Sequence, residues 1–295
     1  MSLRLEMLQV ARLSPDMLGD STQLVADFLR SQHHEDGGFC DRSGRSDIYY
    51  TTFGIAGLTA LQLPLPVEPL CRYLNAWMTR IASLSLVELS CLARCWAGLP
   101  AEVRPDDLAA HVMQGLSGFR TDDGGYGTEL GDKEGTLYGC FLALSSAQDV
   151  DQSLPDAGEM LRCIRSLKSA DGGYANSRDL PFGLVPPTAA ASALLRHLGE
   201  DRDPDIQPWL LSCLHPEGGF VVGPGIPMPD LLSTAVALHA LNDTHCDIEP
   251  MKEHCLDYLD TLWTARGGFF GTWEDDALDL EYTYYGLLSL GHLSL

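Results

Sequence analysis

Glycine pairs, each followed by an aromatic residue, recur along this chain at nearly constant spacing. They read DGGF at 36–39, DGGY at 123–126, DGGY at 171–174, EGGF at 217–220 and RGGF at 266–269. The last three steps are 46 to 49 residues long, whereas the first step of 87 residues is close to two periods. A period of this length is typical of helical hairpins that stack on one another. The pattern predicts six units, the second without its glycine pair.

Each unit combines two different helices. A helix with a polar face comes first, as in STQLVADFLRSQ, and a uniformly apolar helix rich in small residues follows the glycines, as in TTFGIAGLTAL. A helix with a polar face belongs outside and one that is apolar all round belongs inside. We therefore expect one all-α domain over 1–295, an α/α toroid of six hairpins around a central cavity. The repeats are expected at residues 21–62, 66–100, 106–147, 154–198, 203–242 and 249–293.

Charge and composition exclude several classes of function. The net charge is −22 with only three lysines, so nucleic acid is an unsuitable partner, because phosphate neutralisation needs clustered cations. No apolar run is long enough for a transmembrane segment, and the first residues do not have the pattern of a signal peptide. The nine cysteines are scattered without a CxxC pair, which indicates free thiols in a reducing cytoplasm. We expect a cytoplasmic protein.

An aspartate stands four residues before a threonine at the start of four apolar runs. These aspartates are Asp47, Asp132, Asp230 and Asp279. Aspartate is a favoured N-cap, because its carboxylate accepts the free amide protons of the first helical turn. In a closed ring the inner helices start at the same mouth, so such caps would surround the entrance to the cavity. The motif is thus expected to serve the fold, the site or both.

The segment GGFCDRSGRSDIYYTTFGIAGLTAL gives the chain a recognisable resemblance. It is similar to the last repeat of protein geranylgeranyltransferase β subunits, and most of the chain, roughly residues 20–293, resembles the prenyltransferase and squalene-cyclase repeat family. The resemblance implies an apolar cavity that holds an isoprenoid or another apolar small molecule. It also implies a helical partner subunit, by analogy with the α subunit of the transferases.

The zinc ligands of those transferases are largely missing. Only Asp230 occupies a matching ligand position, since the cysteine position is Leu232 and the histidine position is Tyr282 in the last unit and Tyr50 in the first. A single carboxylate does not make a zinc site. Zinc is therefore possible but disfavoured, and no cofactor is expected. The stretch VVGPGIPMPD also lacks the cations that would bind a diphosphate.

Three hypotheses of function remain open. The first is an isoprenoid-handling protein that resembles prenyltransferase β subunits but has lost their standard ligands. The second is an enzyme similar to class II terpene cyclases, which protonate an alkene or epoxide with the middle aspartate of DxDDTA; DLLSTA aligns with that motif, and Leu232 stands at the position of the acid. The third is a non-catalytic toroid that serves as a protein-interaction module.

Two sets of residues are the candidates for the site. The candidate catalytic acids are Asp230, Asp276 and Asp279, of which Asp276 belongs to an acidic pair with Asp275. A neighbouring like charge or burial could raise the pKa of such an acid. The residues expected to line the cavity are Asp47, Tyr50, Phe53, Asp132, Tyr138, Tyr282 and Tyr285.

Overall fold

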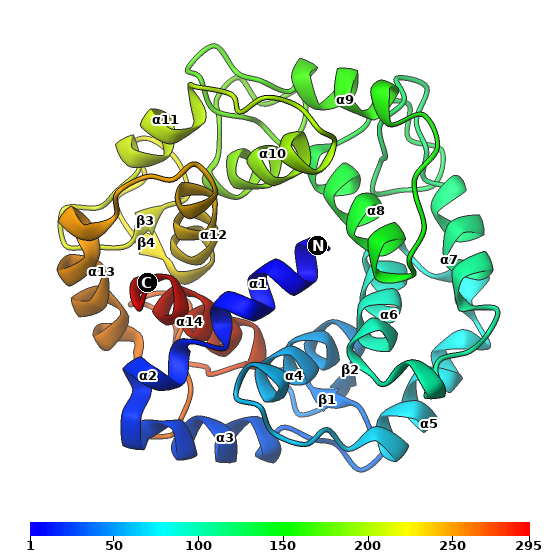
Figure 1. Ribbon diagram of the computed structural model, residues 1–295, viewed down its shortest axis with the longest axis horizontal. Helices are drawn as coiled ribbons and strands as arrows, with labels where there is room; N and C mark the ends of the chain where they lie inside the picture. Colours follow the sequence, from blue (N-terminus) through cyan, green and yellow to red (C-terminus); the bar gives the residue numbers. More distant parts are fainter.

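The computed structural model describes all residues 1–295 as two concentric rings of helices (Figure 1). The six inner helices are α4 (Ile48–Ala60), α6 (Leu86–Gly98), α8 (Leu137–Asp149), α10 (Val185–His197), α12 (Leu231–Asp243) and α14 (Leu280–Leu293). The outer helices are α3 (Thr22–Ser31), α5 (Val67–Met78), α7 (Leu108–Ser117), α9 (Ala157–Ser166), α11 (Ile206–Ser212) and α13 (Glu249–Leu262). Helix α14 packs against α4 and closes the ring. The predicted all-α six-hairpin toroid is confirmed.

Strands are confined to two short hairpins. Strand β1 (Phe39–Cys40) pairs with β2 (Ser46–Asp47), and β3 (Phe220–Val221) pairs with β4 (Pro229–Asp230), both antiparallel. Each hairpin follows a glycine pair and leads directly into an inner helix. None of the helices is both long and apolar enough to cross a lipid bilayer.

The glycine pairs let each unit approach the outer helix of the next. Gly37 has a φ of +104°, and a Cβ atom there would lie 2.1 Å from the carbonyl oxygen of Pro69 in α5. Gly267 has a φ of +88°, and its Cβ would lie 2.0 Å from the carbonyl oxygen of Leu24 in α3. Only glycine satisfies both conditions, because it tolerates positive φ and has no Cβ. The contact with Leu24 joins the last unit to the first and completes the outer ring.

The aspartate–threonine motif is part of this architecture. Asp47, Asp230 and Asp279 are the N-caps of α4, α12 and α14, and their carboxylates accept amide hydrogens from the first helical turn. The threonine hydroxyl links the cap to the turn. That of Thr234 donates to the carbonyl of Asp230 (2.8 Å) and accepts the amide of Phe220 (2.9 Å). The threonine thereby satisfies a buried backbone donor that the two-residue strand leaves unpaired.

The prediction that Asp132 caps an inner helix is wrong. Thr136 is the N-cap of α8 and accepts the amide of Gly139 (2.9 Å). The carboxylate of Asp132 instead accepts the amides of Thr128 and Glu129 in the preceding loop. In this unit the threonine, and not the aspartate four residues before it, caps the inner helix.

The first helix, α1 (Leu3–Ala11), belongs to none of the six repeats and was not predicted from them. Helix α1 runs across the central opening of the ring, and the short helix α2 (Ser14–Leu18) connects it to the outer ring (Figure 1). Ion pairs fasten it to the C-terminal ends of inner helices, from Arg4 to Asp149 in α8 (3.0 Å) and from Glu6 to Arg196 in α10 (2.6 Å). The helix therefore closes one end of the toroid, and the capped N-terminal ends of the inner helices surround the other.

Candidate active site

The centre of the toroid holds a cavity of about 410 Å³. It is lined by 23 residues, of which 15 are hydrophobic. Its volume lies in the range of roughly 300–1,000 Å³ that is usual for small-molecule sites. The cavity is therefore large enough for a ligand, and its walls favour an apolar one.

The wall is built from equivalent positions of the six inner helices. The second residue of every inner helix lines the mouth; these residues are Tyr49, Val87, Tyr138, Pro186, Leu232 and Glu281. One helical turn further in, the lining residues are Phe53, Cys91, Leu142, Ala190, Val236 and Tyr285. A spacing of four residues keeps both layers on the same helix face. Arg94, Ala193 and His239 form a deeper layer, and Leu3 and Met7 from α1 form the floor.

This spacing decides which of the residues predicted to line the cavity do so. Phe53, Tyr138 and Tyr285 line the cavity. Tyr50 and Tyr282 do not, because each follows the second residue of its helix and is rotated about 100° away from the cavity. Asp47 and Asp132 are also absent from the wall: Asp47 caps α4 at the rim, and Asp132 lies in the loop before α8.

None of the three predicted catalytic acids lines the cavity. Asp230 uses its carboxylate to cap α12, and burial raises its pKa. Asp279 caps α14 and pairs with Arg42 (2.7 Å), although burial still raises the pKa of this aspartate. Asp276 is exposed. Its predicted partner Asp275 pairs with Arg42 instead (2.7 Å), so the two acids do not act as a pair.

The carboxyl group that does face the cavity belongs to Glu281. This side chain is largely buried, and its Oε1 accepts a hydrogen bond of 2.6 Å from the hydroxyl of Tyr49. Burial, together with the smaller effect of the nearby Asp279 charge, raises the pKa of Glu281 to about 7, against the opposing effects of the Tyr49 hydrogen bond and the Arg42 charge. At neutral pH a large fraction of Glu281 therefore carries a proton inside an apolar cavity.

The sequence contained a signal for Glu281. It stands four residues before Tyr285, which was predicted to face the cavity, and residues four apart share one helix face. It also stands two residues after a cap aspartate, as Leu232 does after Asp230, and that is the position of the acid in the cyclase motif.

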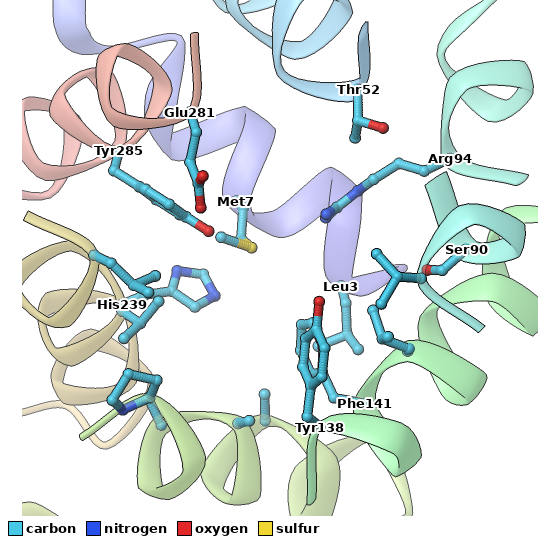
Figure 2. Close-up of a pocket in the computed structure, with 18 of the residues that line it drawn as sticks. Leu3, Met7, Thr52, Ser90, Arg94, Tyr138, Phe141, His239, Glu281 and Tyr285 are labelled. Atoms are coloured by element: carbon cyan, nitrogen blue, oxygen red, sulfur yellow. The ribbon is translucent and has the colours of Figure 1, made fainter. Parts of the chain in front are cut away.

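Aromatic side chains surround this acid. The ring of Phe53 lies 5.1 Å from that of Tyr49 and 5.6 Å from that of Tyr285, both edge to face. Tyr138 and Phe141 belong to the same wall. In Figure 2 Glu281 and Tyr285 reach inward from α14, and Tyr138 and Phe141 approach from the opposite side. Such ring faces can stabilise a positive charge that forms between them.

The deeper layer carries further polar groups, among them the single arginine of the cavity wall. Arg94 reaches inward from α6 (Figure 2). A hydrogen bond of 3.0 Å joins Nδ1 of His239 and Nε2 of His292, and burial lowers the pKa of both imidazoles, so the pair is neutral at pH 7. His239 also lies near Glu6 and Asp243, and the ligand atoms of these three residues lie within 4.8 Å of one another. Arg196 already bonds both carboxylates and supplies a positive charge there.

The residues around Asp230 do not fit the zinc ion that the resemblance to transferases implies. Its Oδ1 is occupied by the amide of Ser233 (2.7 Å). Leu232 presents a hydrocarbon side chain to the cavity, and Tyr282 lies outside the wall. Zinc in proteins needs three or four nitrogen, sulfur or carboxylate ligands around one point. No such set converges here.

Comparison with known proteins identifies the family. The model of the prenyltransferase alpha-alpha toroid domain matches residues 5–85, 75–180 and 188–294. The chain therefore belongs to the prenyltransferase α/α-toroid family, as its repeats predicted. No curated protein sequence matches it significantly.

Solved structures show the same fold at low sequence identity. The type II terpene cyclase MstE from Scytonema, in complex with its substrate geranylgeranyl dihydroxybenzoate, is 14% identical with a TM-score of 0.63 over 95% of this chain and 97% of that one. Candida albicans protein geranylgeranyltransferase-I, complexed with GGPP, is 15% identical with a TM-score of 0.64 over 91% and 90%. A protein from Actinoplanes is 15% identical with a TM-score of 0.61 over 93% and 98%.

Proposed function

We propose that this protein is an isoprenoid cyclase of the class II type, in which Glu281 donates the proton that starts the reaction. The observation that carries the proposal is a single buried carboxyl group, hydrogen-bonded to Tyr49, in an apolar cavity lined by aromatic rings. A general acid has to hold its proton at the working pH and to face the reacting atom. Glu281 satisfies the first condition through burial and the second through its place on the cavity wall.

The chemistry follows from the groups around the cavity. The carboxyl proton of Glu281 passes to an alkene carbon or an epoxide oxygen at the end of the substrate, and a cation forms on the adjacent carbon. The π electrons of a neighbouring double bond attack this cation and close a ring. Loss of a carbon-bound proton then forms a new double bond, so substrate and product are isomers, and Glu281 regains its proton from solvent.

Tyr49 and the aromatic wall assist different stages of this sequence. The hydrogen bond from Tyr49 to Glu281 stabilises the carboxylate that remains after proton transfer, and so strengthens the acid. Phe53 and Tyr285 present rings close to the acid, where the first cation forms. The apolar lining excludes water, which would otherwise capture the cation.

Transfer of a prenyl group from a diphosphate has less support. Arg94 is the sole cationic residue in the cavity wall, and Glu281 shares the same space. A diphosphate brings several negative charges, which need several cations or a metal ion to neutralise them. The similar structures of both kinds are complexes with isoprenoid ligands: geranylgeranyl dihydroxybenzoate in the cyclase and GGPP in the transferase. The isoprenoid class is common to them, and the acid in this cavity favours cyclisation.

Deuterium incorporation tests the proposal. Wild-type protein and Glu281→Gln are incubated with C15 and C20 polyprenyl compounds that end in an alkene, in H2O and in D2O, because protonation of an alkene places the deuterium on carbon, where it does not exchange. We expect a product isomeric with the substrate in H2O, one added deuterium in D2O, and no product with Glu281→Gln.

Asp230→Asn is the matched control, because asparagine also caps helices and Asp230 does not line the cavity. This variant should keep most of the activity. An active Glu281→Gln, or a product that forms in D2O without deuterium, would refute the proposed acid.

A further inference from the structure

The guanidinium of Arg94 has no partner in the structure. It forms no ion pair or hydrogen bond with any residue and is stacked on no aromatic ring. Acids elsewhere in the deep layer are already engaged, since Asp149 pairs with Arg4 and Glu6 pairs with Arg196. Glu281 is bonded to Tyr49. The charge of Asp149 acts on Arg94 from a distance, but no acid of the protein forms a direct ion pair with Arg94.

A second unpaired donor lies on the same face of α6. Ser90 precedes Arg94 by four residues, so both side chains face the cavity one helical turn apart. The hydroxyl of Ser90 forms no hydrogen bond within the protein. The hydroxyl of Thr52, which also lines the cavity, donates to the carbonyl of Ile48 (3.1 Å). Arg94 and Ser90 together offer donors to a ligand that has acceptors and a negative charge.

From this arrangement we infer that the substrate ends in a carboxylate, which binds Arg94 and Ser90 in the deep part of the cavity. The inference rests on the proposed function and specifies its substrate class as an isoprenoid acid. The planar guanidinium matches a carboxylate through two parallel hydrogen bonds. A charged arginine in an apolar cavity is unfavourable without an anion, and a bound carboxylate would supply one.

The charge of the wall sets the charge of the ligand. Arg94 contributes one positive charge, and His239 is neutral because burial lowers its pKa. One cation balances one carboxylate and leaves most of the charge of a diphosphate unpaired. The donor set thus selects a monoanion.

The same arrangement orients the substrate. Arg94 follows Val87, the mouth residue of its helix, by seven residues, which places it about 10 Å deeper along the helix axis. Glu281 belongs to the mouth layer and lies on α14, which α4 separates from α6 in the inner ring. With its carboxylate at Arg94, the apolar chain extends toward the mouth and brings its far end to Glu281. Protonation then occurs at the end of the chain away from the acid group.

Calorimetric titration with farnesoic acid and farnesol tests the inference, since the two probes share one chain and differ in charge. The proteins are the wild type, Arg94→Gln, and the control Arg72→Gln on the outer face of α5. Farnesoic acid should bind the wild type and the control more tightly than farnesol does. Arg94→Gln should weaken the acid about 10- to 100-fold, which is typical of a lost charged hydrogen bond, and change farnesol less than twofold.

The outcomes separate this inference from the proposed function. Equal binding of both probes, unchanged in Arg94→Gln, would overturn the carboxylate site and leave the cyclase proposal intact. Equal weakening of both probes by Arg94→Gln would also overturn it, because the residue would then only shape the cavity. Binding of neither probe would overturn the inference and the isoprenoid class together. Thermal unfolding of Arg94→Gln checks its fold, and we expect no loss of stability, because the residue has no partner to lose.

Discussion

Glu281 allows a quantitative test, because the burial that keeps its proton also destabilises the folded protein. Its pKa is raised from an ordinary value of 4.5 to about 7. Each tenfold change in acid dissociation corresponds to about 1.4 kcal/mol, so ionised Glu281 lowers the free energy of unfolding by about 3 kcal/mol. Below pH 4.5 the group is neutral in both states and has no such effect. The penalty grows as the pH rises from 4.5 and is complete above 7.

The substitution Glu281→Gln removes this penalty and leaves a side chain of similar shape whose amide oxygen can accept the Tyr49 hydrogen bond. At pH 8 we expect the variant to be more stable than the wild type by about 3 kcal/mol, or roughly 5 °C in melting temperature for a domain of this size. At pH 5 the gain should be less than about 1 kcal/mol. Urea unfolding at pH 5, 6.5 and 8 measures the difference.

The control for this experiment is Glu253→Gln, which changes an exposed glutamate on α13 and should alter stability by less than about 0.5 kcal/mol at every pH. A gain for Glu281→Gln of the same size at pH 5 and pH 8 would show that the pKa of Glu281 is not raised. A loss of stability at pH 8 would show that the ionised carboxylate makes favourable contacts, and would contradict the role of Glu281 as a proton donor.

The same pKa predicts how activity depends on pH. Only the protonated form of Glu281 can donate, so kcat/KM should fall tenfold per pH unit above about pH 7. Tyr49→Phe removes the hydrogen bond that lowers the pKa of Glu281, so this limb of the profile should move to higher pH. At pH 5 the rate should fall, because the acid becomes weaker. A fall in rate at every pH without movement of the limb would assign Tyr49 a packing role only.

Three further substitutions test the architecture by thermal or urea unfolding. Asp279→Ala removes a cap and a buried ion pair and should cost about 3 kcal/mol, whereas Asp276→Ala at an exposed position should cost less than about 0.5; equal effects would contradict the cap interpretation. Thr234→Val leaves a buried amide unpaired and should cost about 1–3 kcal/mol; a neutral result would show that the amide finds another acceptor. Arg4→Met should cost about 3 kcal/mol at pH 7 and less at pH 4, where Asp149 takes up a proton; a loss that does not depend on pH would argue against the ion pair.

The fold could be predicted because its determinants are local and repeated. A glycine pair at fixed spacing, a helix with a polar face and a helix without one are each visible in single segments, and six copies reinforce one another. The role of α1 could not be read in this way, since it belongs to no repeat. Its ion pairs join Arg4 and Glu6 to Asp149 and Arg196, which are about 145 and 190 residues away. Such pairing is decided by tertiary structure and leaves no local pattern.

The candidate site was predictable in part, and the part that failed is instructive. The cap aspartates were expected to face the cavity because they stand at the helix starts. Successive residues of a helix, however, point in directions about 100° apart, so neighbours at a helix start do not share one direction. The cap residue satisfies backbone amides at the rim, and only the residue two positions later enters the cavity. Phe53, Tyr138 and Tyr285 satisfy this periodicity, whereas Tyr50 and Tyr282 do not. Glu281, the acid that we propose, stands two positions after the cap aspartate Asp279.

This offset explains how one toroid can support different chemistry without a change of fold. The caps and the threonines are bound to the backbone, so their replacement destabilises the helix starts. The second residue of each inner helix has no such structural duty, and six of them surround one mouth. In the resembling cyclase motif the acid stands at the position of Leu232; here that position is apolar, and the acid that we propose is Glu281 on the neighbouring helix α14. Since α12 and α14 are adjacent in the ring, an acid on either helix reaches the same cavity. The position of the acid within the repeat is therefore a better guide to function than the repeat that carries it.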